Sequence, residues 1–382
     1  MNYWVLFHIL VIGLIPLLNA WNYASLVTEG DRRRRRRKYT VMAVWLAAAV
    51  AGGGYFIYYR EAYLSLTGTA AVVAAYAATI WVVAQSVLWI PLVLMRLAAL
   101  VGGKRVWNIT ATCLLAAVFA VSAYGAVDGH LHWERERLEV MSAKLPPSFE
   151  GLKIALIADT HIGPYYRLDD LRTQLADAKR ERADYVIIAG DLIDETDPAV
   201  LAELTDIINT EAAHFTYGID FVWGNHEYYY NRPRVAEALH ASRLRILENE
   251  HYELRRGDAG IIVAGVDYPF GTAATREKEI ADFTDAALQG APASQFRLLI
   301  AHHPDFLKAG FDRGVDLIVA GHTHGMQINI MGRPFLPLYT YNRGVFYEGH
   351  SVGYVTRGTG HWFPFRLGCP RELTYITLHA GK

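Results

Sequence analysis

Long apolar runs dominate the first third of the chain. They lie around 3–27, 40–59, 69–95 and 107–127, and each approaches or exceeds the roughly 20 residues that a helix needs to cross a bilayer. Four core helices of such length in succession would need an unusually large soluble protein to cover them. The first run has no basic residue ahead of it, which argues against a cleaved signal peptide. We therefore predict a membrane domain, residues 1–130, with four transmembrane helices.

The pattern changes to short apolar runs in the rest of the chain. In 131–150 the stretch "WERERLEVM" alternates charged and other residues, as expected for a linker and leading strand with one solvated face. From 151 to 382, β-rich runs alternate with helical stretches such as "LDDLRTQLADAKRERA". The runs are "LKIALIAD", "ADYVIIAGD", "IDFVWGN", "AGIIVAGVD", "FRLLIAHH" and "VDLIVAGH". They predict an α/β domain with one or two well-covered sheets.

Basic residues between the apolar runs predict the orientation in the membrane. "DRRRRRRK" (31–38) follows the first run, and Arg96, Lys104 and Arg105 lie between the third and fourth, whereas only Arg60 separates the second from the third. Cytoplasmic loops carry the excess of Lys and Arg. We therefore expect an integral, multi-pass protein of a plasma or inner membrane, with its N-terminus and its α/β domain on the extracytoplasmic side.

Composition excludes several classes of function. The 37 Lys and Arg against 38 Asp and Glu give no reason to expect a nucleic-acid partner. The arginine run is an unpromising nucleic-acid site, because it lies between two predicted spans, and its simplest role is to set topology. Cys113 falls in the fourth apolar run and Cys369 near the end of the chain, so no disulfide within a domain and no zinc ribbon is predicted.

Metal-binding residue types follow the predicted strands. The strand exits read "ADTH" (158–161), "GDLID" (190–194), "GNHE" (224–227), "AHHPD" (301–305) and "GHTHG" (321–325). Strand ends are where α/β sheets collect ligands, and imidazole, carboxylate and carbonyl groups suit borderline divalent metals. A single His after a strand is more often structural. Five such exits in this order predict a shared metal site, with glycines that let the backbone turn tightly.

These five motifs resemble those of the calcineurin-like metallophosphoesterases over roughly residues 150–380. "FVWGNHEYYY" and "VTRGTGHWFPFRLGCPRELTYITL" further resemble a membrane-linked subgroup that includes transmembrane proteins with a metallophosphoesterase domain and relatives that are UDP-2,3-diacylglucosamine pyrophosphatases. The resemblance implies an α/β/β/α sandwich and a hydrolase of phosphoester or pyrophosphate bonds. Met326 and Tyr268 depart from the subgroup's pattern, which affects the expected shape of the pocket.

The resemblance also implies two divalent metal ions and the residues that hold them. Their identity stays open among Mn, Fe, Zn, Ni and Co, because this mixed set of ligands suits several. One ion is expected on Asp159, His161 and His324. The other is expected on Asn225, His302 and His322, and Asp191 would bridge the two. Such a pair supplies an activated water for in-line displacement, so no protein nucleophile is needed.

Four residues beside the implied ligands are expected to have other roles. His226 resembles the family's catalytic histidine, which stabilises the transition state or protonates the leaving oxygen. Asp194 is expected to orient a ligand or a loop, and His303 is expected either to do the same or to line the pocket. For Glu227 we favour packing or surface display over a role in substrate access.

The predicted function is that of a membrane-anchored, dinuclear-metal-dependent phosphoesterase. Confinement near the bilayer favours a lipid-linked or envelope substrate. The expected partners are therefore the bilayer and a phosphorylated small molecule or lipid. The sequence does not predict the oligomeric state. Two alternatives remain. The first is the UDP-2,3-diacylglucosamine diphosphatase reaction of lipid A biosynthesis, which a cytoplasmic domain would favour. The second is a non-catalytic membrane sensor or binding module.

Overall fold

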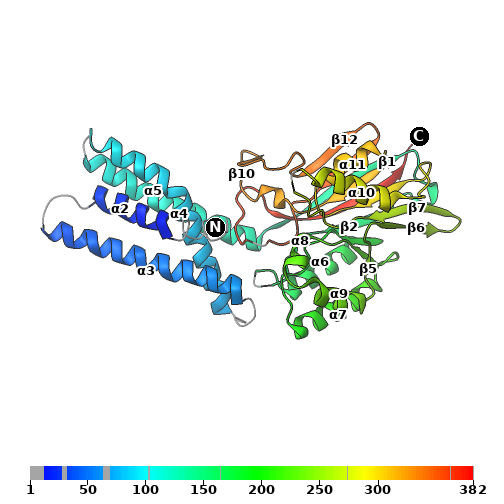
Figure 1. Cartoon of the computed structure of the whole chain (residues 1–382), viewed down its shortest axis with the longest axis horizontal. Coiled ribbons are helices and arrows are strands. Elements are labelled where there is room, and N and C mark those ends of the chain that lie inside the picture. The colour runs from blue at the N-terminus through cyan, green and yellow to red at the C-terminus, as the bar shows by residue number, and fades with distance from the viewer. Residues whose placement is uncertain are drawn as a thin grey trace. The chain divides into compact units, whose positions relative to one another are not determined.

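The chain folds into two compact units, which are described separately. The first comprises Met1–His130 with Phe363–Phe365, and the second comprises Leu131–Trp362 with Arg366–Lys382. The first is helical and the second combines helices with strands (Figure 1). The computed structural model describes residues 13–27, 32–62, 69–101, 104–163, 165–272, 274–361 and 363–381.

The long helices of the first unit pack around a small apolar core with polar links. They are α2 (Ile15–Val27), α3 (Arg32–Ala62), α4 (Thr69–Ala98) and α5 (Lys104–Leu131). Leu26 of α2 and Ala111 of α5 belong to the same buried cluster. The Gln85 side-chain oxygen of α4 accepts hydrogen bonds at 2.9 Å from Asn19 and from Trp45. Buried polar links of this kind hold apolar helices in register.

Two of the four predicted spans correspond to helices that are long and apolar enough to cross a membrane. They are Tyr76–Ala98, with 23 residues, and Trp107–Leu131, with 25. No other helix of the described residues meets that description. The first predicted span begins outside the described residues, and α2 has only 13 residues. The second lies within α3, which also carries the arginine run. The membrane region is therefore supported at two positions and unconfirmed at the other two.

The arginine run is helical, whereas we expected a loop between helices at 31–38. α3 begins at Arg32 and continues without a break into the apolar segment. Arginine is a good helix former, so the run extends the helix ahead of the segment. Lys38 links α3 to α2, because its ammonium lies 4.1 Å from the centre of the Trp21 ring and donates to the Ser25 hydroxyl at 3.2 Å.

The second unit contains two six-stranded sheets and a small hairpin. The first sheet runs β1 (Trp133–Ser142), β14 (Arg371–Ala380), β2 (Lys153–Ile157), β3 (Tyr185–Ile188), β4 (Ile219–Phe221), β5 (Arg245–Ile246). The second runs β12 (Gly344–Glu348), β13 (Ser351–Val355), β9 (Leu317–Ala320), β8 (Arg297–Ile300), β7 (Ala259–Gly265), β6 (Glu250–Arg256). The hairpin pairs β10 (Asn329–Ile330) with β11 (Arg333–Pro334).

The two sheets pack face to face, and helices cover their outer sides. Apolar residues of both sheets, such as Ile187 of β3 and Leu298 of β8, form one core between them. A second core lies under α6 (Leu168–Arg180), α7 (Pro198–Ala212) and α9 (Arg232–His240). A third lies under α10 (Arg276–Leu288) and α11 (Phe306–Asp312), on the opposite side (Figure 1). The predicted α/β domain is confirmed, with two sheets.

Parallel strands bring the motifs together. β2, β3 and β4 are mutually parallel in the first sheet, as are β7, β8 and β9 in the second. Their carboxyl ends therefore emerge at a common edge of each sheet. The motifs that begin with Asp159, Asp191 and Asn225 leave the first sheet there, and those with His302 and His322 leave the second.

Candidate metal centre

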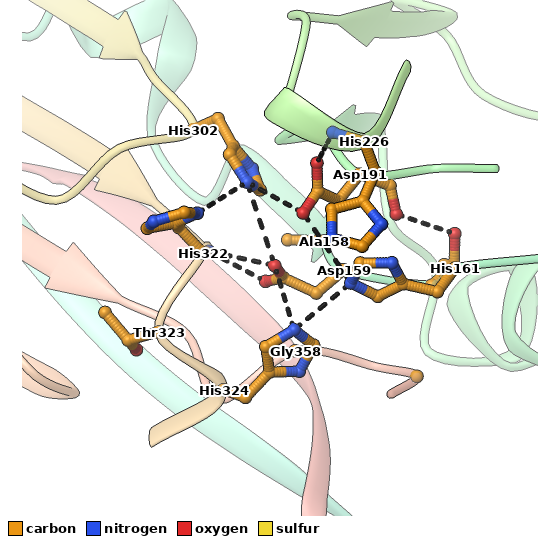
Figure 2. Close-up of polar contacts among 12 residues, drawn as sticks. Ala158, Asp159, His161, Asp191, His226, His302, His322, Thr323, His324 and Gly358 are labelled. Carbon is orange, nitrogen blue, oxygen red and sulfur yellow. Dashed lines mark hydrogen bonds and ion pairs between the residues drawn. The ribbon is translucent and has the colours of Figure 1, made fainter. Parts of the chain in front are cut away.

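The strand exits place histidines and carboxylates in three overlapping groups. In each group the possible ligand atoms lie within 4.8 Å of one another. Figure 2 shows the imidazoles gathered around the two carboxylates of Asp159 and Asp191. The groups are Asp159 with His161 and His324, His161 with Asp191 and His226, and Asp191 with His302 and His322. The sharing of Asp191 and His161 between groups makes one continuous centre.

The distances between facing atoms suit ligands that share an ion. The Nε2 atoms of His161 and His324 are 3.1 Å apart, and His302 Nε2 lies 3.2 Å from His322 Nδ1. The same His302 nitrogen is 3.1 Å from Asp191 Oδ2. Two ligand atoms, each about 2.1 Å from one ion, lie roughly 3.0–3.4 Å apart at octahedral to tetrahedral angles. The observed spacings fall within that range.

Each of three histidines has one ring nitrogen held by the protein and the other directed at the centre. His302 donates from Nδ1 to the Ala189 carbonyl at 2.7 Å, because a carbonyl only accepts. His161 Nδ1 lies 3.0 Å from a carboxylate oxygen of Asp194, and His322 Nε2 lies 3.1 Å from the Tyr339 hydroxyl. Metal-binding histidines are oriented in this way, since the outer contact fixes the ring and its tautomer.

An unsatisfied oxygen of Asn225 supports a cation at the same place. Asn225 is buried, and its Oδ1 has no hydrogen-bond partner among the described residues. A buried polar oxygen without a partner is costly, and native structures resolve the cost with a water or an ion. Asn225 follows β4 as the first residue of α8 (Asn225–Tyr229), next to the exits of Asp159 and Asp191. The residues present therefore fit divalent metal.

The backbone at the candidate ligands is strained. Positive φ values, which ordinary L-residues rarely adopt, occur at five of them. The values are 54° at Asp159, 48° at His161, 51° at Asp191, 72° at His322 and 51° at His324. Such conformations cost about 1–3 kcal/mol each and persist only where the surrounding structure imposes them. Here they turn the chain sharply at the strand exits, so that successive side chains point into the centre.

Asp194 positions two histidines at once. One of its oxygens lies 3.0 Å from His161 Nδ1 and 2.8 Å from His226 Nδ1. Burial opposes ionisation of Asp194, but His226 and His161 outweigh it and lower the pKa of this carboxyl to about 2. Burial likewise opposes the charge on His226, yet Asp194 and Asp191 raise its pKa to about 10. Asp194 lies where we expected an orienting residue.

Glu227 has a larger role than the sequence suggested. We expected packing or surface display, and its carboxylate is fully buried, which excludes surface display. It accepts hydrogen bonds from the backbone N–H groups of Leu192 at 2.6 Å and Gly224 at 2.9 Å, with Asp191 and Ile193 at 3.3 Å. One side chain thus joins two of the motifs. The available signal was a Glu at the third position of a helix, where it caps the preceding turn.

Aromatic side chains form a wall beside His322. The rings of Tyr268, His303 and Tyr339 lie 5.5, 4.9 and 5.5 Å from it, centre to centre. His303 is buried, and burial lowers its pKa to about 3. Its Nδ1 accepts from the Asp305 amide at 3.2 Å, so this histidine lines the centre, and the three groups of potential ligands do not include it. Neither Tyr339 nor its contact with His322 was anticipated.

Comparison with known proteins identifies the family. The family model described as "Calcineurin-like phosphoesterase" matches residues 152–326, which contain all five motifs. The chain belongs to the calcineurin-like phosphoesterase family. This match confirms the family membership that the motifs predicted. We also predicted a metal-dependent hydrolase of phosphoester bonds, which is the class that the family's name denotes.

Several known proteins are similar to this chain in sequence. An uncharacterized metallophosphoesterase of Helicobacter pylori is 32% identical over 230 residues, which are 59% of this chain and 60% of the relative. The uncharacterized protein YpbG of Bacillus subtilis is 30% identical and is covered over 98% of its length by 74% of this chain. The chain spans only about three fifths of the Helicobacter pylori proteins.

The chain is also similar to a protein named as a transmembrane protein, and more distantly to solved structures. A transmembrane protein with metallophosphoesterase domain of Danio rerio is 29% identical, over 69% of this chain and 61% of that protein. Among solved structures, a dimetal phosphatase from Danio rerio has 17% identity and a TM-score of 0.34, covering 55% of this chain and 88% of that one. A likeness that low says nothing about function.

Proposed function

We propose that the chain is a membrane-anchored phosphoesterase that uses two divalent metal ions to hydrolyse a phosphoester or pyrophosphate bond. The observation that carries the proposal is the sharing of Asp191 between a group with His161 and His226 and a group with His302 and His322. A carboxylate between two histidine groups suits a pair of ions. Asp159, His161 and His324 would hold one, and Asn225, His302 and His322 the other.

Two ions at this centre would supply Lewis-acid polarisation of the phosphoryl oxygens and a water of lowered pKa. The protein's part is to orient and to move a proton. Asp194 holds His226 through Nδ1, which leaves the opposite nitrogen for a substrate oxygen. The His226 side chain is 17% exposed, whereas His161 and His302 are essentially buried. We assign proton donation to the leaving oxygen to His226 for this reason.

The membrane association suggests where the substrate comes from. Two apolar helices and relatives named as transmembrane proteins support an anchored enzyme. A lipid-linked or envelope phosphate would reach such an enzyme by diffusion in or near the bilayer. We propose that class of substrate, with the catalytic unit on the extracytoplasmic side, as the basic residues flanking the apolar runs suggest.

The activity is tested by phosphate release from purified full-length chain in detergent, with Mn²⁺ added first and other divalent ions afterwards. Phosphomonoesters, phosphodiesters, nucleotide-sugar pyrophosphates and a lipid extract serve as substrates. Asp191→Ala should abolish release, because the shared carboxylate is lost, whereas Asp258→Ala in the β6–β7 turn should leave it unchanged. Equal activity in the wild type and Asp191→Ala would defeat the enzyme assignment and favour a non-catalytic binding module.

Sidedness has a separate test. A reporter fused after Lys382 that is active only outside the cytoplasm should be active, and one that is active only inside should be silent. The opposite result would place the catalytic unit in the cytoplasm and direct the substrate screen to UDP-2,3-diacylglucosamine.

A further inference from the structure

The segment 328–341, which follows the last metal-binding motif, exposes an unusual run of large apolar side chains. It contains the β10–β11 hairpin and the loop after it. Five of its side chains are between 54% and 99% exposed: Ile330, Met331, Phe335, Leu336 and Leu338. Soluble surfaces rarely expose large apolar residues in a contiguous group unless the group contacts a partner or a membrane.

The charged side chains within this stretch of the chain are basic. No Asp or Glu occurs between Gly321 and Tyr347, whereas Arg333 lies among the apolar positions and Arg343 follows them. Arg333 is exposed at the start of β11. Anionic lipid headgroups attract basic residues, and apolar side chains next to them enter the boundary between headgroups and acyl chains. A second copy of the chain offers no such charge complement at this segment, because the segment would face its own arginines.

The chain itself keeps the catalytic unit close to a membrane surface. The candidate span in α5 ends at Leu131, and β1 begins at Trp133, so a single residue separates them. A domain tied by so short a connection cannot diffuse away from the bilayer that α5 enters. The exposed segment therefore meets a lipid surface at a high local concentration.

The same segment is attached to the candidate metal centre. The Tyr339 hydroxyl lies 3.1 Å from His322 Nε2, and the Thr323 hydroxyl donates to the Asn342 carbonyl. These contacts hold the end of the loop to the "GHTHG" motif. Insertion of its apolar side chains would therefore bring the lipid headgroup layer to the ligand His322.

We propose that the segment 328–341 is a membrane-inserting loop, which docks the catalytic centre on the surface of an anionic bilayer. The inference rests on the membrane anchoring proposed above, but not on catalysis. The apolar side chains enter the bilayer, and the arginines contact lipid phosphates.

Fluorescence quenching in the full chain tests this proposal. Met331→Cys carries an environment-sensitive dye, in a chain whose exposed Cys113 is replaced by Ala while the buried Cys369 is kept. Asp258→Cys, at the tip of the polar β6–β7 hairpin, is the matched control. Both proteins are reconstituted into phosphatidylcholine vesicles with and without phosphatidylglycerol. Lipids with a nitroxide at either end of the acyl chain, and iodide in the water, serve as quenchers.

The dye at 331 should be quenched by the lipid nitroxides at least about threefold more than the dye at 258, and most by the nitroxide near the headgroup, because interfacial insertion reaches about 5–10 Å. Replacing Phe335 and Leu336 by Ser should reduce that quenching at 331 and leave 258 unchanged. Quenching by iodide alone at both positions would overturn the proposal. Shielding from both quenchers would indicate a second copy and would also overturn it.

The two proposals fail separately. Asp191→Ala should keep the lipid quenching at 331 while losing hydrolysis. A chain that inserts but hydrolyses nothing contradicts only the enzymatic assignment, whereas one that hydrolyses without insertion contradicts only the loop.

Discussion

At the scale of single residues, the centre depends on hydrogen bonds from neighbouring side chains that orient the candidate ligands and the backbone around them. Asp194 orients His161 and His226, and Glu227 fixes the backbone that presents Asp191. Both contacts are made between groups of the protein itself. They restrict the side chains that would hold an ion, which lowers the cost of ordering ligands around it.

Glu227→Ala should destabilise the catalytic unit by about 2–4 kcal/mol, because it leaves several buried N–H groups without an acceptor. It should also abolish activity, since the turn at Asp191 loses its support. Chemical denaturation and phosphate release measure the two effects. Glu237→Ala, an exposed position on α9, should change neither. Normal activity in Glu227→Ala would mean that the turn at Asp191 keeps its conformation without the hydrogen bonds of Glu227.

At the scale of elements, the turn after β13 lies against Asp159, a candidate ligand. Gly358 has a φ of 79°, and a Cβ placed on it would lie 2.8 Å from the Asp159 Cβ. Gly349, in the turn between β12 and β13, has a φ of 61°, and a Cβ placed on it would have no atom within 4 Å. Both glycines need a positive φ, but only Gly358 lies against a candidate ligand, Asp159.

Gly358→Ala should therefore lose metal and activity, whereas Gly349→Ala should lose only stability. Each substitution places an alanine in the left-handed region at about 1–2 kcal/mol. Metal content after gel filtration separates the two, because only Gly358→Ala pushes on Asp159. Equal metal content in both variants would show that Asp159 tolerates the displacement.

At the scale of the whole molecule, the centre joins the two sheets. His302 comes from the second sheet and donates to Ala189, which follows β3 of the first. Residues of both sheets would share one pair of ions, so metal binding should stabilise the packing of the sheets. Asp159 and Asp191 are both buried, and burial and the charge of Asp191 both raise the pKa of Asp159, so bound ions would offset a repulsion between the two carboxylates.

Removing metal with a chelator should lower the Tm of the catalytic unit, and restoring it at a hundredfold excess over Kd should return about 2.7 kcal/mol of stability for each ion bound. For a unit of this size that is a shift of about 5–11 °C per ion, since 1 kcal/mol moves Tm by roughly 2–4 °C. Differential scanning calorimetry of the full chain measures it. Asp258→Ala should keep the shift and Asp191→Ala should lose most of it. A metal-independent Tm in the wild type would speak against ions between the sheets.

The sequence by itself determined the α/β class and the segments that carry metal-binding residue types, because apolar periodicity and the residues at strand exits are local properties. It also indicated the two helices, within α4 and α5, that are long and apolar enough to cross a membrane, since length and apolarity suffice for that prediction. It was wrong about the arginine run, because helix propensity carries α3 through residues that we expected in a loop.

Only the tertiary structure decided which atoms meet. The positive φ values at the ligands, the burial of Glu227 between two motifs and the contact of Tyr339 with His322 all depend on segments far apart in sequence. Likewise, the exposure of the apolar side chains in the segment 328–341 is visible only in the fold. Burial and strain are set by what packs against a residue, and a linear pattern cannot specify that partner.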